Sequence, residues 1–217
     1  MHTTTRLDGD VHPLRTPPVL LSARQLASTG RRWTMLDQRH GVEVVHIDPG
    51  SGEHSTNAQV LPIGDIALVE RPGTAIAVWA ADCAPVMLFG ARGRVAGVHA
   101  GWRGLASGVL DVALDALDDD VVRAVLGPVI HPCCYAFGPD DLARVGVGAG
   151  VDADRLAGWT SDGELALDVP AAITGALARR GVPMTQVGEC TSCSGRYFSH
   201  RRGDAERHAV VGWWEPS

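Results

Sequence analysis

The stretch Val95–Leu110 reads VAGVHAGWRGLASGVL and combines a strand, a glycine turn and the start of a helix. Residues 95–98 are small or apolar, as is typical of the end of a buried strand. From Leu105 onward the apolar residues recur about every 3.6 positions, which predicts a helix over residues 104–118. His99 and Arg103 therefore lie in or beside a tight turn between a strand and a helix.

This turn suits an anion such as phosphate. Its free backbone N–H groups and the positive end of the helix dipole favour negative charge, and Arg103 offers a bidentate guanidinium. The Lys-Ser/Thr pair of a Walker loop is missing. We therefore expect Gly101, Arg103 and Gly104 to bind phosphate. The alternative is that the two glycines only permit a tight turn and that Trp102 belongs to the core.

Composition and charge narrow the class of protein. The chain has 217 residues, a net charge of −6 and no cluster of Lys or Arg, which argues against nucleic acid as the main partner. Residues 1–18 lack the apolar core of a signal peptide, and no apolar run is long enough for a membrane helix. The five cysteines fit reduced thiols better than a disulfide framework. We therefore expect a cytoplasmic protein with a small-molecule substrate and no membrane or nucleic-acid partner.

The sequence predicts many short apolar strands and a smaller number of helices between them. We expect residues 1–17 to be a loose or edge segment, residues 49–53 to be a loop, and helices near 140–145 and from the cap Asp168 to about 180. The predicted strands cover residues 31–38, 42–48, 66–69, 75–79, 86–89, 94–98, 121–126, 183–187 and 207–211. Because the order has no strict βαβ rhythm, the prediction is one α+β domain over residues 1–217, with mixed β-sheets flanked by helices.

Three residues that can bind a metal stand at the exits of these strands. They are His40, Cys83 and His99, and a sheet would present them at one edge. Two imidazoles and a thiolate suit zinc, and three protein ligands leave the fourth tetrahedral position open, as in catalytic sites. The alternative is that both histidines are ordinary core or turn residues and that Cys83 is a buried thiol.

Five segments together resemble one known family. They are QRHG (38–41), GDIALVERPGTAIAVWAADCAPVML (64–88), HAGWRG (99–104), GPVIHPCCYAFG (127–138) and CTSCSGRYFSHRR (190–202). In this order they are similar to the YfiH-type family, whose members are also labelled laccase-domain or polyphenol oxidase proteins. The resemblance runs from about residue 33 to the C-terminus, and ADC followed by HAGWRG is its most specific part.

The resemblance implies both an activity and a metal site. It implies phosphorolysis of inosine, guanosine, adenosine and methylthioadenosine, with deamination of adenosine besides. Some bacterial members are named instead for a role in peptidoglycan editing. The family's zinc ligands fall on His40, Cys83 and His99, the same trio that the strand exits select.

The sequence departs from the family pattern in two places. Residues 1–30 form a shortened, atypical N-terminal part that retains Thr4-Thr5-Arg6 but lacks the usual Ser-Leu-Asn-Leu stretch. His200 stands where the family more often has Tyr. The first departure bears on how the substrate pocket closes, and the second on a contact to the base or sugar.

Further side chains are needed for the chemistry that this reading implies. Zinc with three protein ligands acidifies its water, which suits attack on the amino-bearing carbon of adenine. Asp82 is the nearest carboxylate in sequence and would move protons, or else orient an imidazole or the loop. Arg103 is the expected phosphate clamp, together with Arg201 or Arg202, whose alternative is a solvated surface pair.

The other cysteines admit several interpretations. Cys133-Cys134 and Cys190-x-x-Cys193 can form a second metal site or a redox pair, but without the context of a thioredoxin helix or a second knuckle we favour buried thiols. We interpret His131, in a glycine-proline loop, as a turn residue.

Three other functions compete with a zinc enzyme. A cysteine hydrolase would use Cys83 as nucleophile and His99 as base. A multicopper oxidase would need roughly ten well-placed His and Cys ligands, so copper is the lesser expectation because the nine histidines are mostly isolated. A non-catalytic module would bind nucleotides or cell-wall precursors. For any of these we expect a monomer or a small homo-oligomer.

Overall fold

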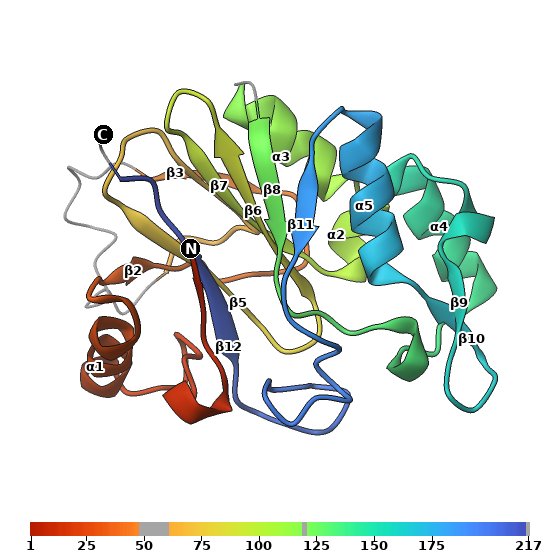
Figure 1. The fold of residues 1–217 in the computed structure, drawn as a ribbon, viewed down its shortest axis with the longest axis horizontal. Coiled ribbons are helices and arrows are strands. Elements are labelled where there is room, and N and C mark those ends of the chain that lie inside the picture. Colours follow the sequence, from red (N-terminus) through yellow and green to blue (C-terminus); the bar gives the residue numbers. More distant parts are fainter. Residues whose placement is uncertain (48–60, 119–120, 216–217) are drawn as a thin grey trace.

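Apolar strands that are buried on both faces form the centre of the structure. The computed structural model describes residues 1–47, 61–118 and 121–215 (Figure 1). Its larger sheet has six strands in the order β11-β8-β6-β7-β4-β3. Their bounds are β3 Val44–Ile47, β4 Ile66–Val69, β6 Ala84–Gly90, β7 Val95–Ala100, β8 Val121–Leu126 and β11 Met184–Gln186. The β3–β4 and β8–β11 pairs are parallel and the others antiparallel, so the sheet is mixed.

A second, four-stranded sheet packs against one face of the first. Its order is β1-β12-β5-β2, with bounds β1 His2–Thr3, β12 His208–Gly212, β5 Ala75–Ala80 and β2 Trp33–Thr34. Ile76 and Val78 of β5 share a buried cluster with Met87 and Phe89 of the larger sheet. A Cβ on Gly97 would lie 3.1 Å from both Ile76 Cδ1 and Val78 Cγ2, so glycine at this position permits the close approach.

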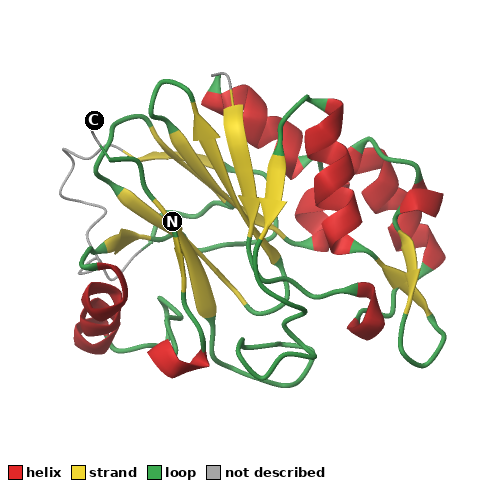
Figure 2. Ribbon diagram, viewed as in Figure 1, coloured by secondary structure: helices red, strands yellow, loops and turns green. Residues whose placement is uncertain are grey.

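Helices cover the opposite face of the larger sheet. They are α2 Trp102–Ala106, α3 Val109–Leu117, α4 Pro139–Ala149 and α5 Val169–Arg179, gathered on one side of the strands in Figure 2. The first helix, α1 Pro18–Thr29, lies at the other end of the molecule, where its Leu21 joins the cluster on the outer face of the smaller sheet. The larger sheet packs on different partners through its two faces, because successive residues of a strand point to opposite faces. Ile66 and Leu68 face the helices, and Ala67 and Val69 face the second sheet.

The predicted α+β class with mixed sheets is confirmed, and several elements differ in detail. The helix predicted over 104–118 is in fact two helices, because Gly108 between them has a φ of 77°. The helix expected near 140–145 extends over Pro139–Ala149, and the strand expected over 31–38 is reduced to Trp33–Thr34 with an isolated bridge at Asp37.

Several elements of the structure were not predicted from the sequence. They include α1, the hairpin of β9 Ala157–Trp159 and β10 Leu165–Leu167, and the 3-10 turns Arg6–Asp8, Pro132–Cys134 and Ala153–Arg155. The edge character expected of residues 1–17 is borne out by β1, which pairs with β12. The loop predicted over 49–53 lies outside the described residues. Within those residues every helix is too short or too polar to span a bilayer.

Candidate active site

His40, Cys83 and His99 meet at the end of the molecule where the chain crosses between the two sheets. His40 lies on the segment from β2 to β3, and Cys83 on the turn from β5 to β6. His99 is the penultimate residue of β7 and pairs with Pro85 of β6. One ligand atom from each residue lies within 4.8 Å of the others, and Cys83 Sγ is 3.8 Å from His40 Nε2. The three residues selected from the sequence therefore form a group that can hold a metal ion.

A carboxylate that the sequence analysis missed orients this group. Asp65 Oδ1 is 2.8 Å from His99 Nδ1, and the Asp65 carboxylate also accepts backbone N–H groups of Arg39, His40 and Gly41. Because Nδ1 of His99 is bound to Asp65, its Nε2 is left to face Cys83 and His40. The available signal was the position of Asp65 immediately before the apolar strand Ile66–Val69, which lies beside β7.

Charge is concentrated between Cys83 and His99. Burial alone would raise the pKa of Cys83, but the positive charge of His99 and a hydrogen bond from His40 lower it to about 6. Burial alone would lower the pKa of His99, but the Cys83 thiolate and the hydrogen bond to Asp65 raise it to about 9. Burial also works against the ionised Asp65, yet the hydrogen bond to His99 holds the pKa of that carboxyl below its usual value. The group is thus a thiolate beside an imidazolium, and metal binding would displace the imidazolium proton.

Asp82 lies next to the trio and anchors the loop opposite. Its carboxylate accepts from Thr191 Oγ1 at 2.6 Å, from Ser199 Oγ at 3.1 Å and from the Arg201 backbone N–H at 2.7 Å. Its φ is 97°, a conformation that costs a non-glycine residue free energy and that these bonds help to hold. Of the two roles considered for Asp82, positioning is the one that its contacts favour.

The glycines of the predicted phosphate turn have close neighbours. A Cβ on Gly101 would lie 2.7 Å from His40 Cδ2 and 3.2 Å from Cys83 Sγ, and one on Gly104 would lie 3.1 Å from the Gly41 carbonyl oxygen. Both glycines therefore let the helix α2 pack directly against the segment that carries His40. Since α2 has only five residues, its dipole contributes little, and phosphate binding depends on the nearby side chains.

A cavity of about 730 Å³ opens onto the trio. Aromatic side chains form part of its wall, namely Trp79, Trp102 and Tyr135. The cavity is otherwise basic, with His12, His40, His99, His200, Arg103, Arg201 and Arg207 in its lining. Among the described residues that line it, Asp82 alone carries a carboxylate, and that group is already hydrogen-bonded. The cavity is therefore suited to a molecule that combines a flat ring with negative charge.

The predicted arginines separate into two kinds. Arg103 Cζ lies 4.4 Å from the Trp102 ring centre, and Arg201 Cζ lies 5.2 Å from that of Tyr135. Both line the cavity and are exposed, and neither has a carboxylate partner in the part of the chain that the structure describes. Arg202 does not line the cavity: its guanidinium donates to four carbonyl oxygens, among them those of Thr191 and Tyr197, and pairs with Asp204.

Two further lining residues bear on the departures from the family pattern. His200, which replaces the more usual Tyr, lies in the cavity wall. His12 comes from the segment before α1 and packs on Trp79 with ring centres 4.7 Å apart. Sequence reasoning missed His12 because only the folding of residues 1–17 along β12 brings it to the cavity.

Comparison with known proteins identifies relatives of this chain. The family model described as multi-copper polyphenol oxidoreductase laccase matches residues 19–215. A Xylella fastidiosa protein named purine nucleoside phosphorylase is 36% identical over an alignment of 190 positions that covers 82% of this chain and 70% of that protein. Purine nucleoside phosphorylase YlmD of Geobacillus stearothermophilus is 31% identical over 83% of this chain and 70% of its own length, and YfiH of Escherichia coli is 34% identical over 77% and 67%.

Solved structures match the fold as well. The crystal structure of a Neisseria meningitidis protein superposes with a TM-score of 0.77 at 28% identity, covering 94% of this chain and 84% of that one. The structure of YlmD from Geobacillus stearothermophilus superposes with a TM-score of 0.76 at 24% identity over 94% and 83%, and so shows the same fold.

Proposed function

The chain belongs to the family described as multi-copper polyphenol oxidoreductase laccase. Within this family, we propose that it is a metal-dependent purine nucleoside phosphorylase. Relatives in which this chain covers about 70% of the length are named purine nucleoside phosphorylase, which supports an enzyme of that type. The observation that carries the proposal is that His40, Cys83 and His99 meet at a cavity that Arg103 and Arg201 also line, without a carboxylate partner among the described residues.

Zinc is the metal that we assign to the trio. In tetrahedral zinc sites, bond lengths of about 2.0–2.1 Å to nitrogen and 2.3 Å to sulfur separate the two ligand atoms by about 3.6 Å. Cys83 Sγ and His40 Nε2 lie 3.8 Å apart. Asp65 binds the far ring nitrogen of His99, as carboxylates commonly do to orient a zinc-bound imidazole. When bound, zinc would supply Lewis acidity and an acidified water at its open position. The centre of a multicopper oxidase would need a larger set of histidines than the trio offers.

The basic side chains of the cavity account for the use of phosphate. Arg103 and Arg201 approach from different segments, and each can donate two hydrogen bonds to one phosphate. In phosphorolysis a phosphate oxygen bonds to the sugar carbon while the bond from that carbon to the purine nitrogen breaks. The purine leaves with the electron pair and takes up a proton, and the sugar leaves as its 1-phosphate. Both arginines would hold the phosphate in line with the bond that breaks.

The remaining side chains would position the nucleoside or hold together the loops that line the cavity. The aromatic rings of Trp102 and Tyr135 offer faces for the purine. Asp82 would act as a positioning residue, since its three hydrogen bonds tie the turn that carries Cys83 to the segment that carries Arg201. The trio leaves a fourth tetrahedral position open, and on that ground we also propose hydrolytic deamination of adenosine at the same site.

Product analysis tests the proposal. Metal-analysed protein is incubated with inosine or adenosine plus phosphate, and free base and ribose 1-phosphate are separated by chromatography. Both products are expected to form, to disappear in His99→Ala and after chelation, and to return when zinc is added to the wild type. Conversion of adenosine to inosine without phosphate would report the deaminase activity.

Three outcomes would replace the proposal with one of its alternatives. Activity that resists chelators but is lost on thiol alkylation would favour a cysteine hydrolase that uses Cys83 and His99. Several coppers per chain would favour an oxidase. Binding of inosine without turnover in the presence of phosphate would favour a non-catalytic module for nucleotides or cell-wall precursors.

A further inference from the structure

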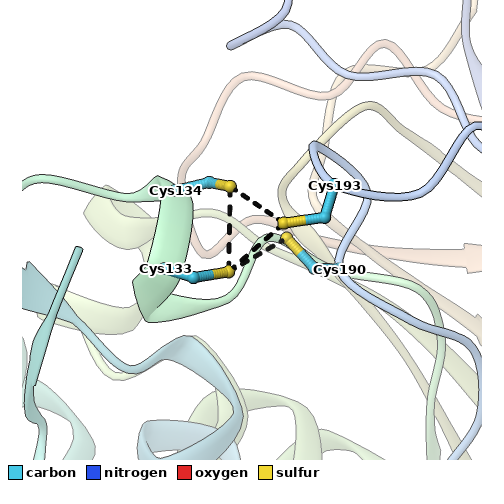
Figure 3. Close-up of side chains that lie close together, drawn as sticks. All are labelled: Cys133, Cys134, Cys190 and Cys193. Carbon is cyan, nitrogen blue, oxygen red and sulfur yellow. Dashed lines mark hydrogen bonds between the residues drawn. The ribbon is translucent and has the colours of Figure 1, made fainter. Parts of the chain in front are cut away.

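Four cysteines that have no part in the proposed reaction lie together outside the cavity. Cys133 and Cys134 belong to the 3-10 turn Pro132–Cys134, and Cys190 and Cys193 to the loop after β11. Figure 3 shows their four sulfur atoms facing one another across the gap between the two segments. Each Sγ lies within 4.8 Å of the other three. The expectation of buried thiols holds for Cys190 alone, because Cys133 and Cys134 are partly exposed and Cys193 is exposed.

The separations between these sulfurs fit a shared metal ion. The Sγ atoms of Cys133 and Cys134 are 3.7 Å apart, and Cys133 Sγ is 3.9 Å from Cys190 Sγ and 3.4 Å from Cys193 Sγ. Four thiolates at about 2.3 Å from a tetrahedral zinc stand about 3.8 Å apart. A disulfide would need about 2.05 Å, well below the 3.2 Å between the Cys134 and Cys193 sulfurs.

One sulfur of the cluster has a backbone donor directed at it. The Cys190 sulfur accepts a hydrogen bond from the His131 backbone N–H at 3.4 Å. Ser161 donates its backbone N–H and its hydroxyl to the Cys133 carbonyl, which holds the facing turn in place. N–H groups directed at a thiolate offset part of its charge, which a site of four thiolates requires.

We propose that Cys133, Cys134, Cys190 and Cys193 bind one structural zinc ion in a closed four-thiolate site. Four soft donors with no open position are typical of structural rather than catalytic zinc. Each thiol releases its proton to solvent as its sulfur binds, so no oxidant or reductant is needed. The site is separate from His40, Cys83 and His99, and it does not depend on what those residues bind.

The ion would join two segments that form the cavity wall. Tyr135 directly follows Cys134, and Arg201, which lies over the Tyr135 ring, follows the second cysteine pair. Thr191, between Cys190 and Cys193, donates to Asp82 at 2.6 Å. A metal ion at the cluster would therefore set the distance between the loop that carries Tyr135 and the loop that carries Arg201.

Metal analysis of the full chain tests the site separately from the proposed active site. In His40→Ala/His99→Ala protein we expect one zinc per chain to remain. Adding Cys134→Ser and Cys193→Ser to that protein should remove it, whereas adding Ser192→Ala should not, because Ser192 lies between the cysteines and contributes only its backbone. Cobalt alone, added to the chelated His40→Ala/His99→Ala protein, should give the intense charge-transfer absorption of a thiolate site.

A thiol titration of the wild type tests the same site without any variant that must fold. With zinc bound, the four cysteines of the cluster should resist a thiol reagent, as read from the masses of the modified peptides, and a chelator should make all four reactive. Absence of zinc from the His40→Ala/His99→Ala protein, or zinc retained after the two cysteine substitutions, would overturn the proposal. So would iron in place of zinc, or a mass lower by two hydrogens for each disulfide formed.

Discussion

At the scale of single residues, Asp65 determines which nitrogen of His99 faces the other two ligands. It binds His99 Nδ1 at 2.8 Å and also accepts backbone N–H groups of the segment that carries His40. One buried carboxylate thus orients two of the three proposed ligands. Removal of its charge should therefore disturb the metal site.

We predict that Asp65→Asn weakens zinc binding by about 10–100-fold, the range typical when a carboxylate hydrogen-bonded to a metal-binding histidine is removed. Competition with a chromophoric chelator measures the affinity. Asp37→Asn is the matched control, since Asp37 lies on the segment that carries His40 and pairs with Arg39 rather than with His99. Equal affinity in Asp65→Asn and the wild type would show that the carboxylate does not support the metal.

Gly101 allows the closest approach in the site. An added Cβ would lie 2.7 Å from a ring carbon of His40, too close for either to stay in place. We predict that Gly101→Ala lowers turnover of a purine nucleoside by about 100-fold, the order of loss that a displacement of 1 Å can cause. Gly138→Ala serves as the control, because nothing lies within 4 Å of the added Cβ there and its φ of −75° suits alanine. Normal turnover in Gly101→Ala would mean that His40 is not needed in this position.

At the scale of elements, burial on both faces explains which predictions succeeded. The strand Ile66–Val69 has the predicted bounds, since an apolar run between two covered faces has few other solutions. Val121–Leu126 has them as well, although only its second half is buried. The hairpin of β9 and β10 is short and partly exposed, so its sequence carries little apolar pattern. Helix α1 begins at Pro18, a residue that suits the first turn of a helix, but it buries only Leu21, Ser22 and Gln25 and thus lacks a clear apolar stripe.

The same reasoning separates what could be predicted of the site. His40, Cys83 and His99 could be selected because each stands near the end of an apolar strand. The role of His12 depends on the packing of distant segments, which no local pattern records. That of Asp65 depends on the pairing of β4 with β7, and its position just before an apolar strand is the sequence signal for it. The break between α2 and α3 depends on the φ of one residue, Gly108, and an apolar periodicity continues across it.

Asp168 is the N-cap of helix α5 in the structure, as the sequence predicts. Its Oδ1 accepts the Ala171 backbone N–H at 2.9 Å and caps α5, with Pro170 in the first turn. We predict that Asp168→Ala lowers the free energy of unfolding by about 1 kcal/mol, and that Asp168→Ser restores most of it because serine also caps helices well. Urea unfolding followed by circular dichroism measures both. A loss of the same size in Asp168→Ser would assign the effect to something other than the cap.

At the scale of the whole molecule, the proposed active site lies where the chain passes between sheets. The crossing from β2 to β3 carries His40, and the crossing from β5 to β6 carries Asp82 and Cys83. His40 and Asp82 have positive φ values of 63° and 97°, so both crossings are sharp turns of the backbone. The packing of the two sheets therefore sets the geometry of the site, and conditions that weaken this packing should disturb the site as well.

His208 makes that packing depend on pH. It is fully buried in β12, and burial lowers its pKa from 6.5 to about 4. The unfolded chain binds the proton as the pH falls through 6.5 and the folded chain only near 4, so stability is complete above pH 6.5 and falls by about 3 kcal/mol across this window. We predict that His208→Phe removes this part of the pH dependence in urea unfolding between pH 7 and 4. The pKa of His12 is also lowered to about 4, but its contribution is common to both proteins, so identical slopes would contradict the prediction.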